Sequence, residues 1–328
     1  MKILVTGGTG FTGKALVKRL LDEGHEVTAL DYKEGLKTEE LRKWGATVRI
    51  GTVTNKAVVD ECMKDIDIVH HLAAAFRELD VPESHYDEVN VEGTRNVLKS
   101  AAENNVKRFI YCSTCGVHGN VDNPPGDEEA PIQPADYYQK TKYMAEPIVK
   151  EYHKNGLPSV ILRPAAIYGP GDPERFAMIF KKVSSGSFPM FGDGKTYYHP
   201  LYIDNLIDAF MLAMQEGKGD GEAYLIADEE YVEIEDLVKR TARAMGKEIS
   251  IKHYPVWPLI VAGHVCEKVC SPLKITPPIF PRRVDWFRQN RAFKIDKAKR
   301  DLGYKPEIGL DEGLKRTAQW YKEEGYFK

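Results

Sequence analysis

The chain has few cysteines, nearly balanced charge and no long apolar run. Its 328 residues include five cysteines, an odd number that fits a reducing compartment better than a disulfide framework. The 46 basic and 49 acidic residues leave a net charge of −3 without any basic block, which argues against a nucleic-acid partner. The most apolar late stretch, 256–262, is interrupted by Pro258, whereas a membrane-spanning helix needs about 20 apolar residues. These absences predict a cytoplasmic protein without a membrane span.

Two further absences concern processing and metals. Met1 and Lys2 lead directly into an apolar strand, so we expect no secretory signal. Cys112 and Cys115 form a C-x-x-C pair, but no second pair accompanies it. Structural zinc sites need four ligands at set spacing, and we therefore predict no metal site.

A glycine-rich turn is the most informative feature that is present. Residues 7–13 read Gly-Gly-Thr-Gly-Phe-Thr-Gly, between the apolar residues 3–5 and a helical pattern at 14–23. Glycines there remove the Cβ atoms that block close backbone approach. A diphosphate can then lie against backbone N–H groups at the positive end of the helix. The spacing G-x-x-G-x-x-G is a variant of the dinucleotide fingerprint and predicts a dinucleotide site.

Asp31 ends the apolar run that follows this helix. A carboxylate in that place accepts hydrogen bonds from both ribose hydroxyls and repels a 2′-phosphate. The sequence therefore favours NAD over NADP as the cofactor, although Lys33 close by weakens that preference.

The first half of the chain alternates apolar strands with amphipathic helices. This alternation predicts an α/β fold, a doubly wound parallel sheet whose ligands bind at the carboxyl ends of the strands. Strands are expected at 3–6, 27–31, 47–50, 68–72, 108–112 and 159–163, and helices at 14–23, 38–44, 56–63, 86–104, 136–155, 203–215 and 233–245.

The second half is less regular, with an aromatic-rich loop expected at 187–200. One strand and one helix of this half are expected to return to the main sheet. We expect residues 1–170 plus 201–228 to form a dinucleotide-binding domain. Residues 171–200 plus 229–328 would then form a smaller C-terminal substrate lobe.

Tyr138 and Lys142 form the candidate catalytic pair. They are four residues apart in a helical pattern, so both side chains lie on one face, one turn apart. A nearby ammonium, together with a positive nicotinamide ring, lowers the pKa of a phenol from about 10 toward neutrality. Thr114 follows the preceding strand and supplies a hydroxyl for the substrate oxygen, whereas Ser113 is expected to face away.

At this point the chain resembles the extended short-chain dehydrogenase/reductase family, which includes the NAD-dependent epimerases and dehydratases. The resemblance covers nearly the whole length. The resemblance rests on residues and motifs along the whole chain. They are TGGTGFTG at 6–13, Asp31, HHLAAA at 70–75, NVEGTRNVL at 90–98, YCSTCGVHG at 111–119, Tyr138 with Lys142 and Glu146, RPAAIYGPG at 163–171, HPLYIDN at 199–205 and LGYKP at 302–306.

The resemblance implies a Rossmann-type fold and hydride transfer between NAD and a secondary alcohol or ketone. By position, Thr114, Tyr138 and Lys142 are the catalytic residues. The cofactor residues implied are Gly7, Thr9, Gly10, Phe11, Thr12, Asp31, Leu72, Ala73 and Ala74, together with Tyr138 and Lys142. The substrate residues implied are Phe76, Thr114, His118, Ala166, Tyr198 and His199. His70 and His71 are expected to be hydrogen-bonded structural histidines.

Departures from the family pattern reduce the number of reactions that the chain is expected to catalyse. Cys115 and Gly116 replace the acidic residues of the dehydratases and of the related decarboxylases, so both activities are disfavoured. Epimerases of nucleotide sugars usually carry Asn where this chain has Ala166, and an Arg near Tyr198. Loss of that Arg removes a bidentate partner for a diphosphate, but Arg175, Arg282, Arg283, Arg288 or Arg291 remain as substitutes.

Small residues at 165 and 166 look more like the 3β-hydroxysteroid dehydrogenase-like branch. So does the apolar segment from Tyr254 to Phe280, which suits a lid over a hydrophobic substrate or a peripheral membrane contact. Lobe packing or a dimer contact explains the same segment. An epimerase acting on a nucleotide sugar is the alternative function, and a non-catalytic dinucleotide-sensing protein is a third. Related enzymes imply a homodimer formed through helices 86–104 and 136–155.

Overall fold

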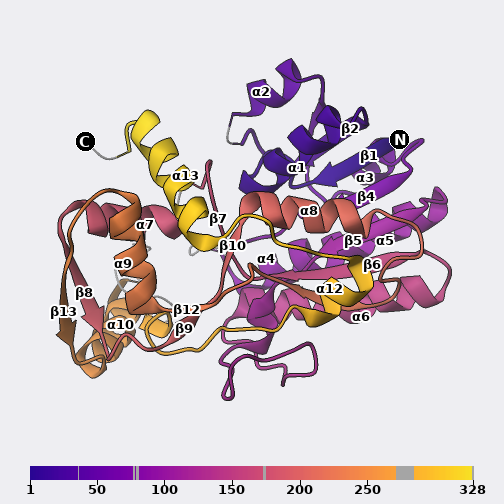
Figure 1. Cartoon of the computed structure of the whole chain (residues 1–328). Helices are drawn as coiled ribbons and strands as arrows, with labels where there is room; N and C mark the ends of the chain where they lie inside the picture. Colours follow the sequence, from indigo (N-terminus) through magenta and orange to yellow (C-terminus); the bar gives the residue numbers. More distant parts are fainter. Residues whose placement is uncertain (36, 77, 79–80, 173–174, 271–283, 327–328) are drawn as a thin grey trace.

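The computed structural model describes residues 1–35, 37–76, 78, 81–172, 175–270 and 284–326. Its centre is a seven-stranded sheet in the order β11-β6-β5-β4-β1-β2-β3 (Figure 1). All neighbouring strands are parallel, which confirms the predicted doubly wound α/β fold. The strands are β1 (Lys2–Thr6), β2 (Glu26–Asp31), β3 (Thr47–Ile50), β4 (Ile68–His71), β5 (Arg108–Cys112), β6 (Ser159–Pro164) and β11 (Ala223–Ile226).

Helices pack on this sheet in two groups. Helix α1 packs against α8, whereas α3, α5 and α6 pack side by side. The bounds are α1 (Phe11–Asp22), α2 (Thr38–Lys43), α3 (Lys56–Cys62), α4 (Glu83–Tyr86), α5 (Gly93–Glu103), α6 (Tyr137–Lys154) and α8 (Ile203–Ala213). As expected, β11 and α8 come from the second half of the chain and join the main sheet.

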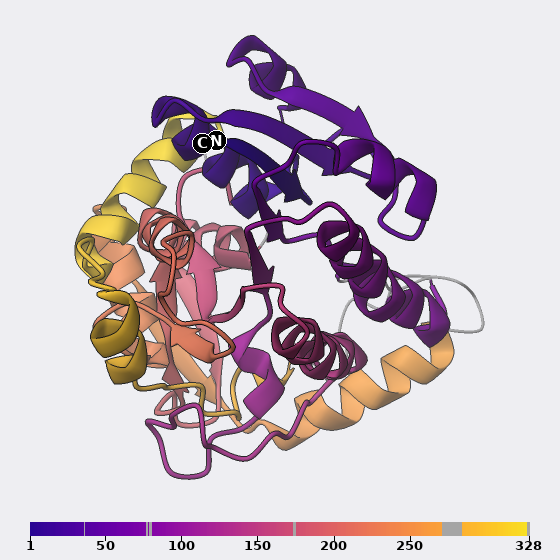
Figure 2. The ribbon, with the colours of Figure 1, turned by 90° about the vertical axis from the view of Figure 1, so that its right-hand side faces the viewer.

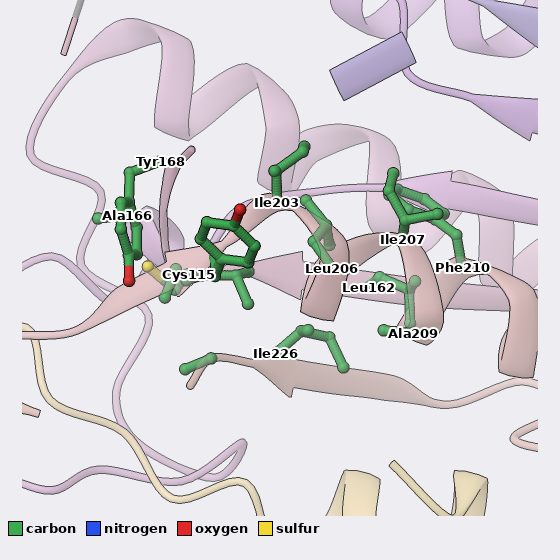
Figure 3. Packing of buried hydrophobic residues seen from close by; sticks show 14 of the residues in the cluster. Cys115, Leu162, Ala166, Tyr168, Ile203, Leu206, Ile207, Ala209, Phe210 and Ile226 are labelled. Carbon is green, nitrogen blue, oxygen red and sulfur yellow. The ribbon is translucent and has the colours of Figure 1, made fainter. Parts of the chain in front are cut away.

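The hydrophobic stripe of α8 shows why this helix returns to the sheet. Ile203, Leu206, Ile207 and Phe210 recur at the helical spacing and are at most 3% exposed. Figure 3 shows these side chains in one packed cluster with Leu162 of β6 and Ile226 of β11. The contact closes the core at one end of the sheet.

The remaining elements gather beside the sheet, at the left of Figure 1. They are β7 (Ala166–Tyr168), α7 (Arg175–Ser184), β8 (Ser187–Phe191), β9 (Tyr197–Tyr198), β10 (Pro200–Tyr202), β12 (Val232–Glu233), α9 (Ile234–Ala244), β13 (Ser250–Tyr254), α10 (Trp257–Cys270), α12 (Asp296–Leu302) and α13 (Leu310–Glu323). Helix α12 is an exception, because it packs on β11 of the main sheet.

The prediction of an irregular loop at 187–200 was wrong. Residues 187–191 form β8, which pairs in parallel with β13, and residues 197–198 form β9. Phe188 and Met190 are buried while their neighbours are more exposed, which is the alternation of a half-buried strand. Pro189, Gly192 and Gly194 concealed that alternation in the sequence.

Part of the predicted apolar segment lies outside the described residues. Leu273, Ile275, Ile279 and Phe280 belong to that part, as do Arg282 and Arg283. In the part of the chain that the structure describes, no helix has both the length and the apolar character needed to cross a membrane.

Candidate active site

The glycine turn brings the backbones after β1 and β4 into contact. Gly7 has φ +71°, and a Cβ added there would lie 2.8 Å from the backbone nitrogen of Ala73. A Cβ on Gly13 would lie 2.1 Å from the carbonyl oxygen of Gly7. Helix α1 begins at Phe11, three residues before the predicted start, so Gly13 lies in its first turn. Only glycine allows this close packing of turn, helix and loop.

Asp31 at the end of β2 holds the same turn. Its Oδ2 accepts hydrogen bonds from the backbone N–H of Thr9 at 3.1 Å and from the Thr9 hydroxyl at 2.7 Å. Lys33 is directed elsewhere, because its Nζ lies 4.7 Å from the centre of the Tyr32 ring. The carboxylate therefore lies beside the turn, at the place expected for a ribose partner.

β1 and β4 mark the point where the strand order reverses. β2 and β3 lie on one side of β1, and β4, β5 and β6 follow on the other. In such sheets ligands bind outside the carboxyl ends of the strands at this point. Leu72, Ala73 and Ala74 follow β4 there, facing the glycine turn.

Tyr138 and Lys142 lie in the first two turns of α6. Asp136 begins the helix by accepting a hydrogen bond from the backbone N–H of Gln139 at 2.8 Å. The Tyr138 ring packs against Phe76, with 4.7 Å between the ring centres, and Phe76 is 41% exposed. The structure thus brings together a predicted catalytic residue and a predicted substrate residue.

Lys142 is buried without a hydrogen-bond partner. It is 1% exposed, and no described residue bonds to its Nζ. The Nζ atom lies over the face of the Tyr111 ring, 4.3 Å from its centre. Burial lowers the pKa of Lys142 to about 8. A buried ammonium without an anionic or hydroxyl partner is costly, so this atom fits a ligand with hydroxyl groups.

Thr114 follows β5 and begins the short 3₁₀-helix η2 (Cys115–His118). Its Oγ1 accepts a hydrogen bond from the backbone N–H of Gly116 at 3.1 Å. The buried hydroxyl of Ser113 donates to Glu146 Oε1 at 2.6 Å. The Ser113 hydroxyl is therefore occupied within the protein, and the alternation of Ser113 and Thr114 at the strand end stays a prediction.

Three of the predicted substrate residues are deeply buried. His118, His199 and Tyr198 are 1%, 2% and 4% exposed. His199 donates from Nε2 to the Asp228 carbonyl at 2.9 Å and accepts from the backbone N–H of Phe293 at 3.2 Å. Burial lowers its pKa to about 4, so the ring is neutral. Direct contact of these residues with a substrate stays a prediction, as does that of Ala166.

The two histidines at the end of β4 differ. His71 Nδ1 pairs with the Thr6 hydroxyl at 2.7 Å and Nε2 with the Thr94 hydroxyl at 2.9 Å, as a structural histidine should. For His70 the prediction of hydrogen bonding was wrong. Neither ring nitrogen has a partner among the described residues, and the ring packs edge-on against Phe210 at 5.6 Å. A buried apolar contact therefore holds it.

Asn90 lies beside the candidate site, although the sequence analysis gave this residue no role of its own. It lies in a π-helical turn, η1 (Asp87–Glu92), where the pattern predicted an ordinary helix from 86. Its side chain accepts from the backbone N–H of Ala75 at 2.8 Å and donates to the Thr141 hydroxyl at 2.9 Å. Asn90 thus joins the loop after β4 to α6. The position of Asn90 at the start of the motif NVEGT was the sequence feature that could have indicated this role.

These residues fit NAD. The glycine turn offers backbone N–H groups, Asp31 a carboxylate, and Lys142 a buried ammonium that no described residue bonds. In that arrangement Asp31 would hold the adenosine ribose and Lys142 the nicotinamide ribose.

Comparisons with known proteins agree. The chain is 30% identical to a 2-alkyl-3-oxoalkanoate reductase of Stenotrophomonas maltophilia, over 96% of this chain and 98% of that protein. It is 29% identical to a 3-beta-hydroxysteroid dehydrogenase of Mycolicibacterium neoaurum, over 98% of this chain and 92% of that one. A UDP-glucose 4-epimerase of Thermotoga maritima, solved with UDP-glucose, superposes with a TM-score of 0.79 at 26% identity, over 99% of both chains.

Residues 3–227 match the model of the NAD dependent epimerase/dehydratase family. The match contains the glycine turn, Asp31, Thr114, Tyr138 and Lys142. The relatives include both dehydrogenases and epimerases, at similar and low identity. The chain belongs to the NAD-dependent epimerase/dehydratase family, the extended short-chain dehydrogenases and reductases, and NAD is its cofactor.

Proposed function

We propose that this protein transfers hydride between NAD and a secondary alcohol or ketone, in the manner of the 3β-hydroxysteroid dehydrogenase-like branch. The observation that carries the proposal is Lys142, a buried ammonium without a partner in the part of the chain that the structure describes, one helical turn from Tyr138. The pair lies in the first two turns of α6, which contacts β6 and the short helix η2 that follows Thr114.

The residues divide the reaction among them. Thr114 holds the substrate oxygen with its hydroxyl, and Tyr138 accepts the alcohol proton or returns it to the ketone. Lys142 binds ribose hydroxyls through Nζ and favours the phenolate of Tyr138 by its charge. When bound, NAD accepts or supplies the hydride.

The proposed substrate is apolar around its reacting carbon. Ala165 and Ala166, which follow β6, are small and apolar, and Phe76 offers an exposed ring next to Tyr138. The names of the reductase and steroid dehydrogenase relatives both describe an oxygen on carbon 3. We therefore expect 3-hydroxy or 3-oxo compounds carrying alkyl or fused-ring groups.

Epimerisation of a nucleotide sugar is the second candidate. It is favoured by the likeness to the UDP-glucose 4-epimerase over the whole chain. That reaction uses the same hydroxyl, phenol and ammonium, but it returns the hydride to the sugar and yields no net NADH.

The test measures NADH formation from NAD with sterol-like and alkyl 3-hydroxy compounds, and sugar conversion with UDP-sugars. We expect NADH with the first group only. Tyr138→Phe should retain NAD binding and lose most turnover, because removal of a general acid–base group typically costs about 10²–10⁴-fold. Full activity of that variant would refute the assignment, and UDP-sugar conversion without NADH would favour the epimerase.

We also propose that residues 1–170 plus 201–228 bind NAD, that the rest forms the substrate lobe, and that the protein is a cytoplasmic homodimer. The five cysteines are all free thiols, which suits a reducing compartment. The outer face of α6 exposes Met144 and Pro147, which suits a helix–helix contact with a second copy. A single monomeric species in sedimentation velocity would refute the dimer, and cofactor protection of the substrate lobe alone against proteolysis would refute the division.

A peripheral membrane contact through α10 is the last part of the proposal. Trp257, Val261 and Val265 lie on one face of this helix and are 67%, 54% and 56% exposed. Lys252 and Lys268 are also exposed nearby and suit anionic lipid headgroups. Figure 2 shows α10, the light orange helix, at the rim of the molecule.

A further inference from the structure

Four buried polar side chains behind the proposed catalytic residues form one hydrogen-bond network. Arg163 of β6 pairs with both oxygens of Glu146, with Nε to Oε1 at 3.0 Å and Nη2 to Oε2 at 2.6 Å. Ser113 donates to the same carboxylate, and Arg163 Nη1 lies 3.1 Å from His118 Nε2. The Glu146 and Arg163 side chains are 1% and 6% exposed.

The protonation of each member follows from its partners. His118 Nδ1 lies 3.0 Å from the carbonyl oxygen of Ala130, so Nδ1 carries the proton. Its Nε2 is then free to accept from Arg163. Burial and the Arg163 charge lower the pKa of His118, which keeps this ring neutral. Every member therefore has a donor matched to an acceptor.

We infer that Glu146, supported by Arg163, is a positioning residue that fixes both Thr114 and Lys142 for the reaction. Ser113 and His118 flank Thr114 on the segment 113–118, and both bond to the ion pair. Glu146 also follows Lys142 by one turn of helix α6. The inference rests on the proposed function, since it concerns the same site.

A stabilising role alone does not account for this pair. A buried ion pair is weak evidence for stability, because desolvation of both charges offsets their attraction. In the inferred role, the pair fixes one geometry of the backbones that carry it. Here those backbones are β5 with η2, β6 and α6, the elements around the catalytic hydroxyl and the ammonium.

Glu146 also acts on Lys142 by charge. The ionisable groups around Lys142 are Tyr111 and Cys112 from β5, His71 from β4, and Tyr138 and Glu146 from its own helix. His71 is neutral, and burial raises the pKa of Cys112 to about 11. Cys112 and Glu146 both oppose the loss of the Lys142 proton on burial, and Glu146 is the carboxylate of the two.

The test compares two carboxylate-to-amide changes. Glu146→Gln removes the charge at the site. Asp220→Asn is the matched control, because Asp220 pairs with buried Arg108 at the opposite end of β5. We expect Glu146→Gln to lower kcat about tenfold or more, with a small change in KM for NAD, and to move the alkaline limb of kcat/KM to lower pH. Asp220→Asn should do neither.

A second readout needs neither cofactor nor substrate. NMR titration of ¹⁵N-labelled lysine, assigned with Lys142→Met, follows the Lys142 ammonium in the NAD-free protein. Its midpoint should fall in Glu146→Gln, recover in Glu146→Asp and stay unchanged in Asp220→Asn. Ser113→Ala keeps the ion pair and should lower kcat without moving the midpoint.

The inference fails if Glu146→Gln matches Asp220→Asn in both the pH profile and the titration. If Glu146→Gln does not fold, an unaltered kcat in Ser113→Ala together with an unaltered midpoint in Arg163→Lys refutes it. Failure of the proposed function is distinct, because then Tyr138→Phe keeps full activity whatever the titration gives.

Discussion

Lys142 shows the conflict between stability and function at a single residue. Its ammonium is fully buried and has no hydrogen-bond partner among the described residues. Burial lowers its pKa from the ordinary value of 10.5 to about 8. A lysine whose pKa is lower in the folded state destabilises the fold below pH 8, and the penalty disappears as the pH rises above 10.5. Near neutrality the penalty is about 3 kcal/mol.

Lys142→Met should therefore stabilise the NAD-free protein at pH 7, by up to about 3 kcal/mol, while turnover is lost. Chemical denaturation without NAD measures the gain, which should vanish toward pH 10. Lys140→Met is the matched control, because Lys140 is exposed on the same helix and its loss should change stability by less than about 0.5 kcal/mol. A destabilised Lys142→Met protein would contradict the account.

The sequence predicts the catalytic pair more easily than the buried hydrogen-bond network behind it. Tyr138 and Lys142 are four residues apart on one helix, so helical geometry alone places them together. Glu146, Ser113, His118 and Arg163 come from separate parts of the chain. Only the folded sheet brings these four together, and no local pattern encodes their pairing.

At the scale of elements, the sequence predicted those helices in which apolar residues recur at the helical spacing along the whole segment. Helices α1, α5, α6, α8 and α9 all carry an apolar stripe that the sequence shows. The sequence did not predict the π-helical turn η1, where Asn90 bonds to Ala75 of a separate segment and no periodic pattern marks the change of helix type. The strands β8 and β13 were not predicted either. They pair with each other, and neither has a clear strand pattern in its own sequence.

Helix α10 is the element whose exposed face predicts an interaction. Partial burial of Trp257, Val261 and Val265 in an interface contributes up to about 1.5–3 kcal/mol for each residue, so binding should be weak and reversible. We expect the protein to float with vesicles of phosphatidylcholine and phosphatidylglycerol at low salt. Trp257→Glu with Val261→Glu should abolish flotation. Met178→Glu, at an exposed residue of α7, should leave it intact, and equal loss in both would contradict the contact.

At the scale of the molecule, the order of the strands gathers the site. The glycine turn, Ala73 and Thr114 follow β1, β4 and β5, which are neighbours in the sheet although they are separated along the chain. The alternation of strands and helices was enough to predict this meeting, because parallel strands present their carboxyl ends at one edge. The surroundings of the substrate were less predictable, since they depend on how small strands and long loops pack beside the sheet.

Buried neutral histidines should control the acid stability of the whole molecule. Burial lowers the pKa of His70 to about 3 and that of His199 to about 4. In the unfolded chain a histidine titrates near about 6.5. Below that pH the unfolded state binds protons that the folded state excludes, so the free energy of unfolding falls as the pH falls. At pH 5 the two residues together cost about 4 kcal/mol, a large part of a typical stability of about 5–15 kcal/mol.

His70→Leu isolates half of that effect, because the ring makes no hydrogen bond with the described residues and packs against Phe210. We expect unchanged or higher stability at pH 7.5 and a gain of about 2 kcal/mol at pH 5 relative to the parent. Urea denaturation at both pH values measures this difference. If His70→Leu lost stability between the two pH values as steeply as the parent, buried neutral His70 would not be a source of the acid sensitivity.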